Sequence, residues 1–188
     1  MPSVFLDRDG TINREVHHLR RVEELVLLDG AAEAIRALNH SAFKVVVVTN
    51  QAAIGRGLLS EPALASIHAA LREMLARQGA HVDAIYYCPH HPTEAEAPFR
   101  VECGCRKPRP GALLRAAAEL GLDLRRSFVV GDKLSDLQAG QAAGCRTVLV
   151  RTGHGCAAEA GLGAAGERPD HVAADLMEAV QWILTQET

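Results

Sequence analysis

Short apolar runs alternate with helical stretches along this 188-residue chain, and that alternation limits the possible folds more than any other feature. The valine-rich run at 43–48 (FKVVVV) is the clearest buried strand. A run this continuous is typical of a strand covered on both faces, as in a parallel sheet. The predicted strands are 3–6, 43–48, 84–88, 127–131 and 146–150, and the predicted helices are 31–40, 61–78, 111–120, 135–143 and 175–185. The pattern predicts an α/β fold, a Rossmann-like three-layer sandwich with helices on both faces of a central parallel sheet.

Two stretches lack this periodicity. Residues 89–110 combine prolines, histidines and cysteines, which predicts a loop that something other than a core must hold in order. Residues 157–168 predict a surface loop or a weak helix. We therefore expect a single domain over residues 1–188, with the loop 88–105 inserted into it.

The charge balance excludes some classes of partner. Twenty basic residues stand against 23 acidic ones, for a net charge of −3, so no basic excess is available to neutralise a nucleic-acid backbone. No apolar run reaches the roughly 18–20 residues of a membrane span, and no secretory signal pattern opens the chain. We expect a cytoplasmic protein, a monomer by default, whose partner is a small phosphorylated ligand.

Polar residues follow three of the predicted strands at the point where each strand ends. The residues are Asp7 and Asp9 after the first strand, Thr49 and Asn50 after the second, and Asp132 and Asp136 after the fourth. Because ligands bind at the carboxyl ends of strands in an open parallel sheet, these groups are expected to share one site. Each residue alone could serve a turn or a helix start, and Asp136 favours the dipole of the helix that follows it. Packing alone does not explain all of them at one edge.

This set of groups suits phosphoryl transfer. A carboxylate that attacks phosphorus approaches a negative group, so it needs a divalent cation, and Mg²⁺ prefers oxygen ligands such as those of Asp7 and Asp132. Lys107 and Thr49 can hold the phosphoryl oxygens. Spacing by two lets Asp7 and Asp9 reach one pocket, which predicts a nucleophile at Asp7 and an acid/base at Asp9.

Three thiols and a neighbouring histidine lie close together in the aperiodic loop. Cys88, Cys103 and Cys105, with either His90 or His91, form a set that can bind Zn²⁺ tetrahedrally. The alternative is free thiols in a loop. A closed site of four protein ligands leaves no position for water, so the sequence predicts a structural zinc that also anchors the adjacent basic residues.

Four motifs in this order resemble those of the haloacid dehalogenase-like phosphatases. They are DRDGT (7–11), TN (49–50), RKP (106–108) and GDKLSD (131–136). The resemblance implies a capless fold, because no large insertion separates the motifs. It also implies Asp7 as the nucleophile that forms an aspartyl-phosphate and Asp9 as the acid/base. Mg²⁺ would be held by Asp7, Asp132 and the backbone carbonyl of Asp9, with Asp136 behind them.

The cysteine loop before RKP resembles one branch of that family, whose members remove the 7-phosphate of heptose 1,7-bisphosphate in activated-heptose and lipopolysaccharide synthesis. The resemblance makes His90 the zinc ligand. It implies substrate contacts at Glu15, Val16, His17, His18, Asn50, Gln51, Ala52, Arg106 and Lys133. The turn reads TNQAA, so Ala52 lacks the hydroxyl that the branch has there, and the preferred sugar and anomer stay open.

Some alternatives and minor expectations accompany this interpretation. Histidinol phosphate is an alternative substrate, and a phosphoaspartate receiver-type signalling module is the alternative from another class. Arg20, Arg56 and Arg109 are candidates for a second phosphate. The other histidines are expected to have no chemical role: His40, His68, His81, His154 and His171.

Overall fold

A six-stranded sheet forms the centre of the computed structural model, which describes residues 1–163 and 168–186. The strands are β1 (Ser3–Leu6), β2 (Lys44–Asn50), β3 (Ala84–Cys88), β4 (Phe128–Gly131), β5 (Arg146–Val150) and β6 (His171–Ala173). They lie in the order β3-β2-β1-β4-β5-β6, and every neighbouring pair is parallel. This order is that of a Rossmann-type sheet, and it confirms the predicted fold class.

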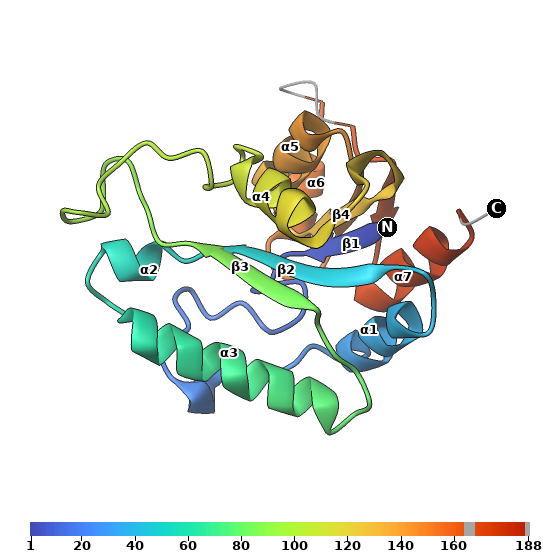
Figure 1. Ribbon diagram of the computed structural model, residues 1–188, viewed down its shortest axis with the longest axis horizontal. Helices are drawn as coiled ribbons and strands as arrows, with labels where there is room; N and C mark the ends of the chain where they lie inside the picture. The colour runs from blue at the N-terminus through green and yellow to red at the C-terminus, as the bar shows by residue number, and fades with distance from the viewer. Residues whose placement is uncertain (164–167, 187–188) are drawn as a thin grey trace.

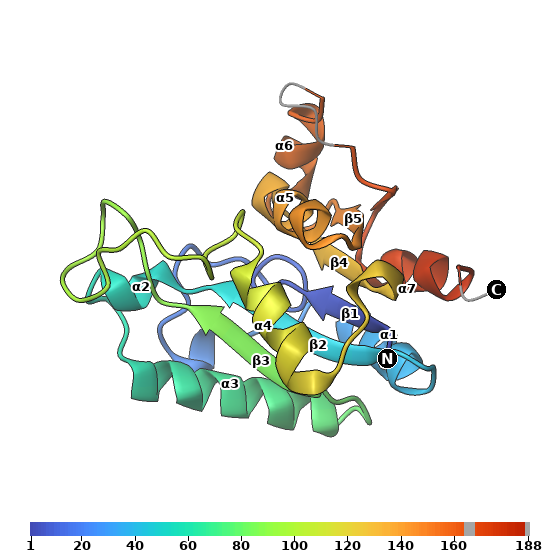
Figure 2. The same ribbon diagram turned by 45° about the horizontal axis from the view of Figure 1, so that its top comes forward.

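Helices cover both faces of the sheet. They are α1 (Ala31–Asn39), α2 (Ala52–Gly55), α3 (Glu61–Ala76), α4 (Gly111–Leu120), α5 (Leu134–Ala143), α6 (Gly155–Ala160) and α7 (Leu176–Leu184), with short 3₁₀ turns η1 (Val22–Glu24) and η2 (Leu124–Arg126). Figure 1 shows α1, α3 and α7 on one side of the sheet and α4 and α5 on the other. Figure 2 shows α4 lying over β2 and β3.

Alternate residues of each strand enter different cores. In β1, Val4 and Leu6 pack with α1, α3 and α7, whereas Phe5 packs with α4 on the opposite face. All three side chains are fully buried, and burying one such side chain stabilises a fold by about 1.5–3 kcal/mol. The strand is therefore fixed from both sides, and so is the start of the loop that follows it.

The structure adds elements that the sequence pattern did not predict. Strand β6 and helix α2 are three and four residues long, too short for a periodic signal. Helix α6 covers the start of the stretch 157–168, while residues 164–167 of that prediction lie outside the described residues. Within residues 1–163 and 168–186, no helix has the length and apolarity needed to cross a membrane.

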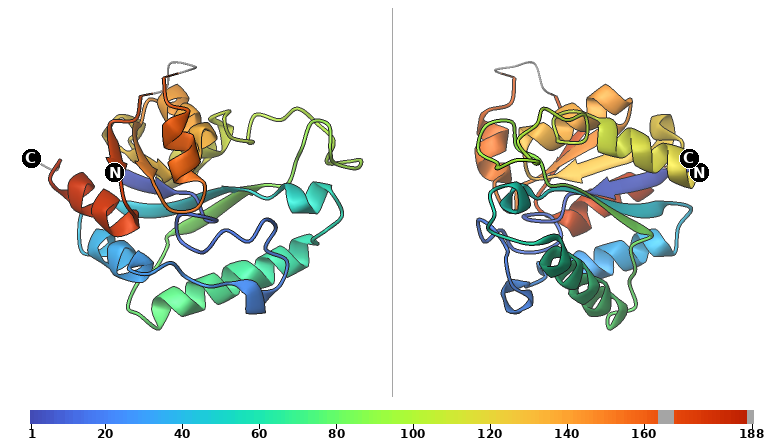
Figure 3. Two further views of the ribbon diagram at one scale, coloured as in Figure 1. Left: turned by 180° about the vertical axis from the view of Figure 1, so that it is seen from behind. Right: turned by 60° about the vertical axis from the view of Figure 1, so that its left-hand side comes forward.

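The loop between β3 and α4 reaches out beside α2, as Figures 1 and 3 show. Backbone hydrogen bonds join the two: the Gly55 N–H donates to the Pro89 carbonyl at 3.2 Å, and the Glu96 N–H donates to the Gly55 carbonyl at 2.7 Å. A Cβ at residue 55 would lie only 2.7 Å from the Pro89 oxygen, so this contact needs glycine. The aperiodic loop is thus anchored where β2 and β3 end.

Candidate active site

The strand order brings the polar strand ends together. Strand β1 lies between β2 and β4, so Asp7, Thr49 and Asp132, which lie at or just beyond the ends of these strands, lie side by side. Asp7 and Thr49 border a cavity of about 430 Å³ at the carboxyl edge of the sheet, and Asp132 is buried beside Asp7. The lining includes Asp7, Asp9, Glu15, His17, His18, Thr49, Asn50, Gln51, Ala52, Arg56, Arg106, Lys107, Lys133, Ser135, Asp136 and His154.

Lys107 is the centre of a buried ion-pair network. Its Nζ lies 2.9 Å from Asp7 Oδ1 and 2.6 Å from Asp136 Oδ1, and it donates to the Val48 carbonyl at 2.7 Å. Burial alone would lower the pKa of Lys107, but the charges of Asp136 and Asp7 outweigh it and raise that pKa. The Asn50 amide donates to the Lys107 carbonyl at 3.0 Å and its oxygen accepts from the Lys107 N–H at 3.1 Å. The lysine therefore stays charged and fixed.

Asp132 provides an oxygen suited to a cation. Its side chain is fully buried, and burial, with the charge of Asp7, raises its pKa to about 7. Oδ2 accepts from the His154 N–H at 2.8 Å, whereas Oδ1 is buried and has no hydrogen-bond partner among the described residues. One carboxylate oxygen from each of Asp7, Asp132 and Asp136 lies within 4.8 Å of the others. Lys133 Nζ lies 3.7 Å from Asp132 Oδ1, and a buried oxygen that accepts no hydrogen bond from the described residues, in an all-oxygen set, fits Mg²⁺.

Gly10 gives the loop after β1 its shape. Its φ of +86° is strained for residues with a Cβ, and a Cβ there would lie 2.2 Å from Asp132 Oδ2. Its carbonyl accepts from the Thr152 hydroxyl at 2.6 Å. The glycine thus lets the first motif turn while the backbone passes directly against Asp132.

Asp9 lines the cavity and is surrounded by donors. The Asn13 amide donates to Oδ1 and the Gln51 amide to Oδ2, both at 2.9 Å, and the Gln51 amide also donates to the Thr49 hydroxyl at 2.9 Å. The Arg8 guanidinium, fully buried, pairs with the same carboxylate at 2.9 Å. Arg8 was not singled out in the sequence, although its place between the two acids was a signal.

The rim of the cavity brings charged side chains from distant segments together. Lys133 Nζ lies 3.2 Å from Glu15 Oε2, and His154 Nε2 lies 3.5 Å from the same oxygen. His154, for which no chemical role was expected, also lines the cavity. On the other side, Arg56 binds His18 Nε2 at 3.1 Å and the Glu94 carboxylate.

Three of the sequence candidates for contact with the substrate lie outside the cavity lining. Val16 is 43% exposed, so its predicted contact with substrate is not supported by its position. Of the arginines proposed for a second phosphate, Arg56 lines the cavity, but Arg20 and Arg109 do not. Arg109 pairs instead with Glu102 at 2.8 Å on the outside of the loop. A side chain's direction out of a loop cannot be derived from its spacing.

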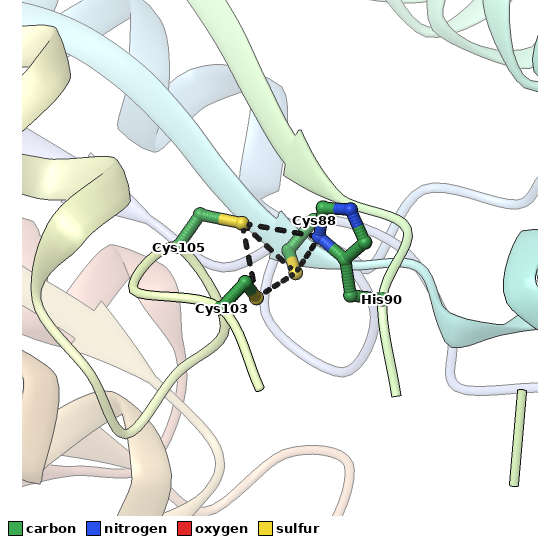
Figure 4. Close-up of side chains that lie close together, drawn as sticks. All are labelled: Cys88, His90, Cys103 and Cys105. Atoms are coloured by element: carbon green, nitrogen blue, oxygen red, sulfur yellow. Dashed lines mark hydrogen bonds between the residues drawn. The ribbon is translucent and has the colours of Figure 1, made fainter. Parts of the chain in front are cut away.

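The four predicted zinc ligands converge at the base of the aperiodic loop (Figure 4). The three sulfur atoms of Cys88, Cys103 and Cys105 lie 3.2–3.5 Å apart, and His90 Nδ1 lies 3.7 Å from Cys88 Sγ and 3.5 Å from Cys105 Sγ. Tetrahedral Zn²⁺, with Zn–S bonds of about 2.3 Å, would place sulfurs about 3.8 Å apart, so the donor set fits that ion. The His91 ring turns away and accepts from the Glu94 N–H.

Known proteins are similar to this chain in sequence and in fold. A family model described as HAD-hydrolase-like matches residues 104–179. The D-glycero-beta-D-manno-heptose-1,7-bisphosphate 7-phosphatase of Yersinia pestis is 44% identical over 160 residues, 85% of both chains. The enzyme of that name from Escherichia coli K12 is 45% identical over 154 residues, 81% of both chains.

The agreement extends to three dimensions. The crystal structure of D,D-heptose 1,7-bisphosphate phosphatase from B. bronchiseptica, complexed with magnesium and phosphate, is 36% identical, with a TM-score of 0.88 over 99% of both chains. The corresponding enzyme from Burkholderia thailandensis is 33% identical, with a TM-score of 0.73. The chain therefore belongs to the haloacid dehalogenase-like phosphatases, in the branch that contains the heptose-bisphosphate phosphatases.

Proposed function

We propose that this protein removes the 7-phosphate of D-glycero-D-manno-heptose 1,7-bisphosphate through an aspartyl-phosphate on Asp7. The observation that carries the proposal is the Asp7 carboxylate at the cavity wall, paired with buried Lys107, in a chain similar over most of its length to phosphatases of that name. The position of each group in the cavity suits it to a role in one of the two chemical steps.

In the first step, a carboxylate oxygen of Asp7 forms a bond to phosphorus while the bond from phosphorus to the sugar C7 oxygen breaks. Asp9 gives its proton to the leaving alkoxide, and Lys107 and Thr49 hold the phosphoryl oxygens. In the second step, water attacks phosphorus, Asp9 takes the water's proton, and the bond between Asp7 and phosphorus breaks. Lys107 fits this role because it is already charged and aligned with Asp7 at 2.9 Å.

Mg²⁺ fits the carboxylate cluster described above. Asp7, Asp132 and the backbone carbonyl of Asp9 would hold the ion, and Asp136 would act from behind them through Lys107. Bound there, the ion screens the repulsion between the attacking carboxylate and the phosphoryl group. The buried Oδ1 of Asp132, which accepts no hydrogen bond from the described residues, supports this assignment.

The sugar and its second phosphate would contact the rim. We assign hydroxyl contacts to Glu15, His17, His18 and Lys133, and add His154, which lies beside Glu15. Arg56 and Arg106 line the cavity and would contact the second phosphate, and Asn50, Gln51 and Ala52 line it as well. The methyl group of Ala52 offers no hydrogen bond to the substrate.

A structural Zn²⁺ at Cys88, His90, Cys103 and Cys105 completes the proposal. Burial raises the pKa of the Cys88 thiol, so a cation is needed to keep it as a thiolate. Cys105 directly precedes Arg106 and Lys107, and the Arg106 guanidinium donates to the His90 carbonyl at 3.2 Å. The zinc would therefore support both the loop and the active-site lysine. The cytoplasmic location, the monomeric state and the place in lipopolysaccharide synthesis stay predictions.

Steady-state kinetics would test the proposal. With Mg²⁺, kcat/KM should favour one anomer of heptose 1,7-bisphosphate over both the other anomer and histidinol phosphate by about a hundredfold, which is about 2.7 kcal/mol of discrimination. Phosphate release is the readout, and heptose 1-phosphate should be the other product. Preference for histidinol phosphate would overturn the sugar assignment, and a stable phosphoprotein without turnover would favour a receiver-type module instead.

A further inference from the structure

We propose that Arg8 and His68 form a positioning pair that holds the Asp9 carboxylate in the orientation its acid–base role requires. The inference rests on the proposed function, which makes Asp9 the acid/base. Neither residue lines the cavity, so each would act through Asp9 rather than touch the substrate.

The Arg8 guanidinium donates hydrogen bonds to both oxygens of the Asp9 carboxylate. Its Nε and one terminal nitrogen donate to Asp9 Oδ1 at 3.2 and 3.0 Å, and the same terminal nitrogen donates to Oδ2 at 2.9 Å. The Arg8 side chain is completely buried, and a buried guanidinium costs several kcal/mol unless it is paired and hydrogen-bonded. A buried cation that contacts both oxygens of the Asp9 carboxylate holds the plane of that carboxylate in one orientation.

His68 completes the pair from a different element. The other terminal nitrogen of Arg8 lies 3.1 Å from His68 Nε2, and α3 supplies this histidine from 60 residues along the chain. Arginine has only donors, so His68 must offer the lone pair of Nε2 and carry its proton on Nδ1. Burial, together with the Arg8 charge, lowers the pKa of His68 to about 4, which agrees with a neutral ring.

The chemistry of arginine suits this task. A guanidinium does not deprotonate in the functional pH range, so Arg8 orients Asp9 without competing for the proton that Asp9 transfers. Its planar fork also matches two carboxylate oxygens at once, which an ammonium group does not. The amides of Asn13 and Gln51 complete the shell, and Asp9 keeps its access to the cavity. His68 therefore fixes Arg8, and Arg8 fixes the acid/base.

The test compares His68→Leu with His68→Gln, whose side-chain oxygen can still accept from Arg8, and with His81→Leu as a control at an exposed histidine. With heptose 1,7-bisphosphate, His68→Leu should lower kcat about 10–100-fold while KM stays within about twofold. His68→Gln should recover kcat to within about threefold of the unmodified protein, and His81→Leu should not change it.

A second substrate separates misplacement of Asp9 from general damage. p-Nitrophenolate leaves without needing a proton, so His68→Leu should release one rapid equivalent per active site from p-nitrophenyl phosphate, then turn over about 10–100-fold more slowly than the unmodified protein. A burst slowed by the same factor as the steady state would mean structural damage and overturn the proposal. Unchanged kcat in His68→Leu would do the same.

Arg8→Lys provides the second route if His68→Leu does not fold. It keeps the charge and loses the two-oxygen grip, so the kcat for heptose bisphosphate should fall at least about tenfold, and unchanged kcat would overturn the inference. Failure of the proposed function is distinguishable: Asp7→Asn would then remain active, whereas failure of the positioning role leaves Asp7→Asn inactive and both His68 variants normal.

Discussion

The carboxylate cluster and the thiol cluster are both suited to metal ions, but the chain holds them in place differently. Asp7 and Asp132 lie just beyond the ends of two adjacent strands, Asp136 lies in the first turn of α5, and Lys107 joins Asp7 and Asp136 by ion pairs. In the thiol cluster, only Cys88 belongs to a strand, and the other three ligands lie in a loop with no helix or strand of its own.

This difference indicates separate roles for the cations that the two clusters would bind. The sheet and the buried lysine build the carboxylate site, so a cation there serves chemistry and affects folding little. The loop has little apolar core, so the order of the thiol site would depend on the bonds to the proposed zinc. One cluster should respond to metal loss by losing turnover, and the other by losing structure.

The largest effect should come from the nucleophile. Asp7→Asn should lower kcat by about 10⁴-fold or more, because an amide cannot attack phosphorus, while the fold is kept. Phosphate release and circular dichroism measure the two properties. Asp29→Asn, at an exposed acid away from the cavity, is the control and should leave both unchanged. Residual activity above about a tenth would contradict the assignment.

The thiol cluster should show the largest effect on stability. Cys103→Ser should remove the bound zinc and lower the free energy of unfolding by about 5 kcal/mol or more, since structural zinc binding contributes directly to folding. Metal analysis and urea denaturation measure it. Cys156→Ser, at an exposed cysteine in α6, is the matched control.

Removal of Mg²⁺ tests the same difference between the two clusters. It should stop turnover while lowering the free energy of unfolding by only about 1–2 kcal/mol, the linkage expected for an ion at about tenfold its Kd. If zinc loss left stability intact, or Mg²⁺ loss unfolded the protein, the proposed division between the two clusters would be wrong.

A substitution at Lys107 tests the carboxylate cluster without changing its acids. Lys107→Met would leave buried carboxylates without a counter-charge, and the free energy of unfolding at pH 7 should fall by about 3–5 kcal/mol. Urea denaturation without Mg²⁺ measures it. Lys44→Met, which breaks a half-exposed pair with Asp83, should cost less than about 1 kcal/mol. Equal losses of unfolding free energy in the two variants would show that burial does not increase the contribution of the Lys107 ion pairs.

The last prediction is a pH response at His68, which contacts Arg8 behind Asp9. The pKa of His68 is about 4 in the folded protein and about 6.5 unfolded, so the unfolded chain takes up a proton first as pH falls. Stability is therefore lost as pH falls from 6.5 to 4, by about 2 kcal/mol between pH 7 and 5. Urea denaturation of the unmodified protein and His68→Gln at both pH values measures it, and identical pH slopes would refute it.

Much of the fold and of the chemistry could be predicted from the sequence because the signals are local. The valine run of β2 predicts a buried parallel strand from six neighbouring residues, and the spacing of Asp7, Asp9 and Gly10 predicts a strand end with paired acids. The cysteine spacing likewise predicts a ligand set, since Cys103 and Cys105 are only two residues apart. Short elements such as β6 and α2 were not predicted, because three or four residues are too few to show a periodic pattern.

Contacts between distant segments were decided only by the tertiary structure. His68 and His154 have no distinctive sequence context, yet helix packing places one against Arg8, and a turn places the other at the cavity rim. The sequence by itself determined which groups are available and which element carries each one, because that depends on nearest neighbours. Only the packing of α3 and the loops against the sheet decided which groups meet, because burial and counter-charges come from residues far along the chain.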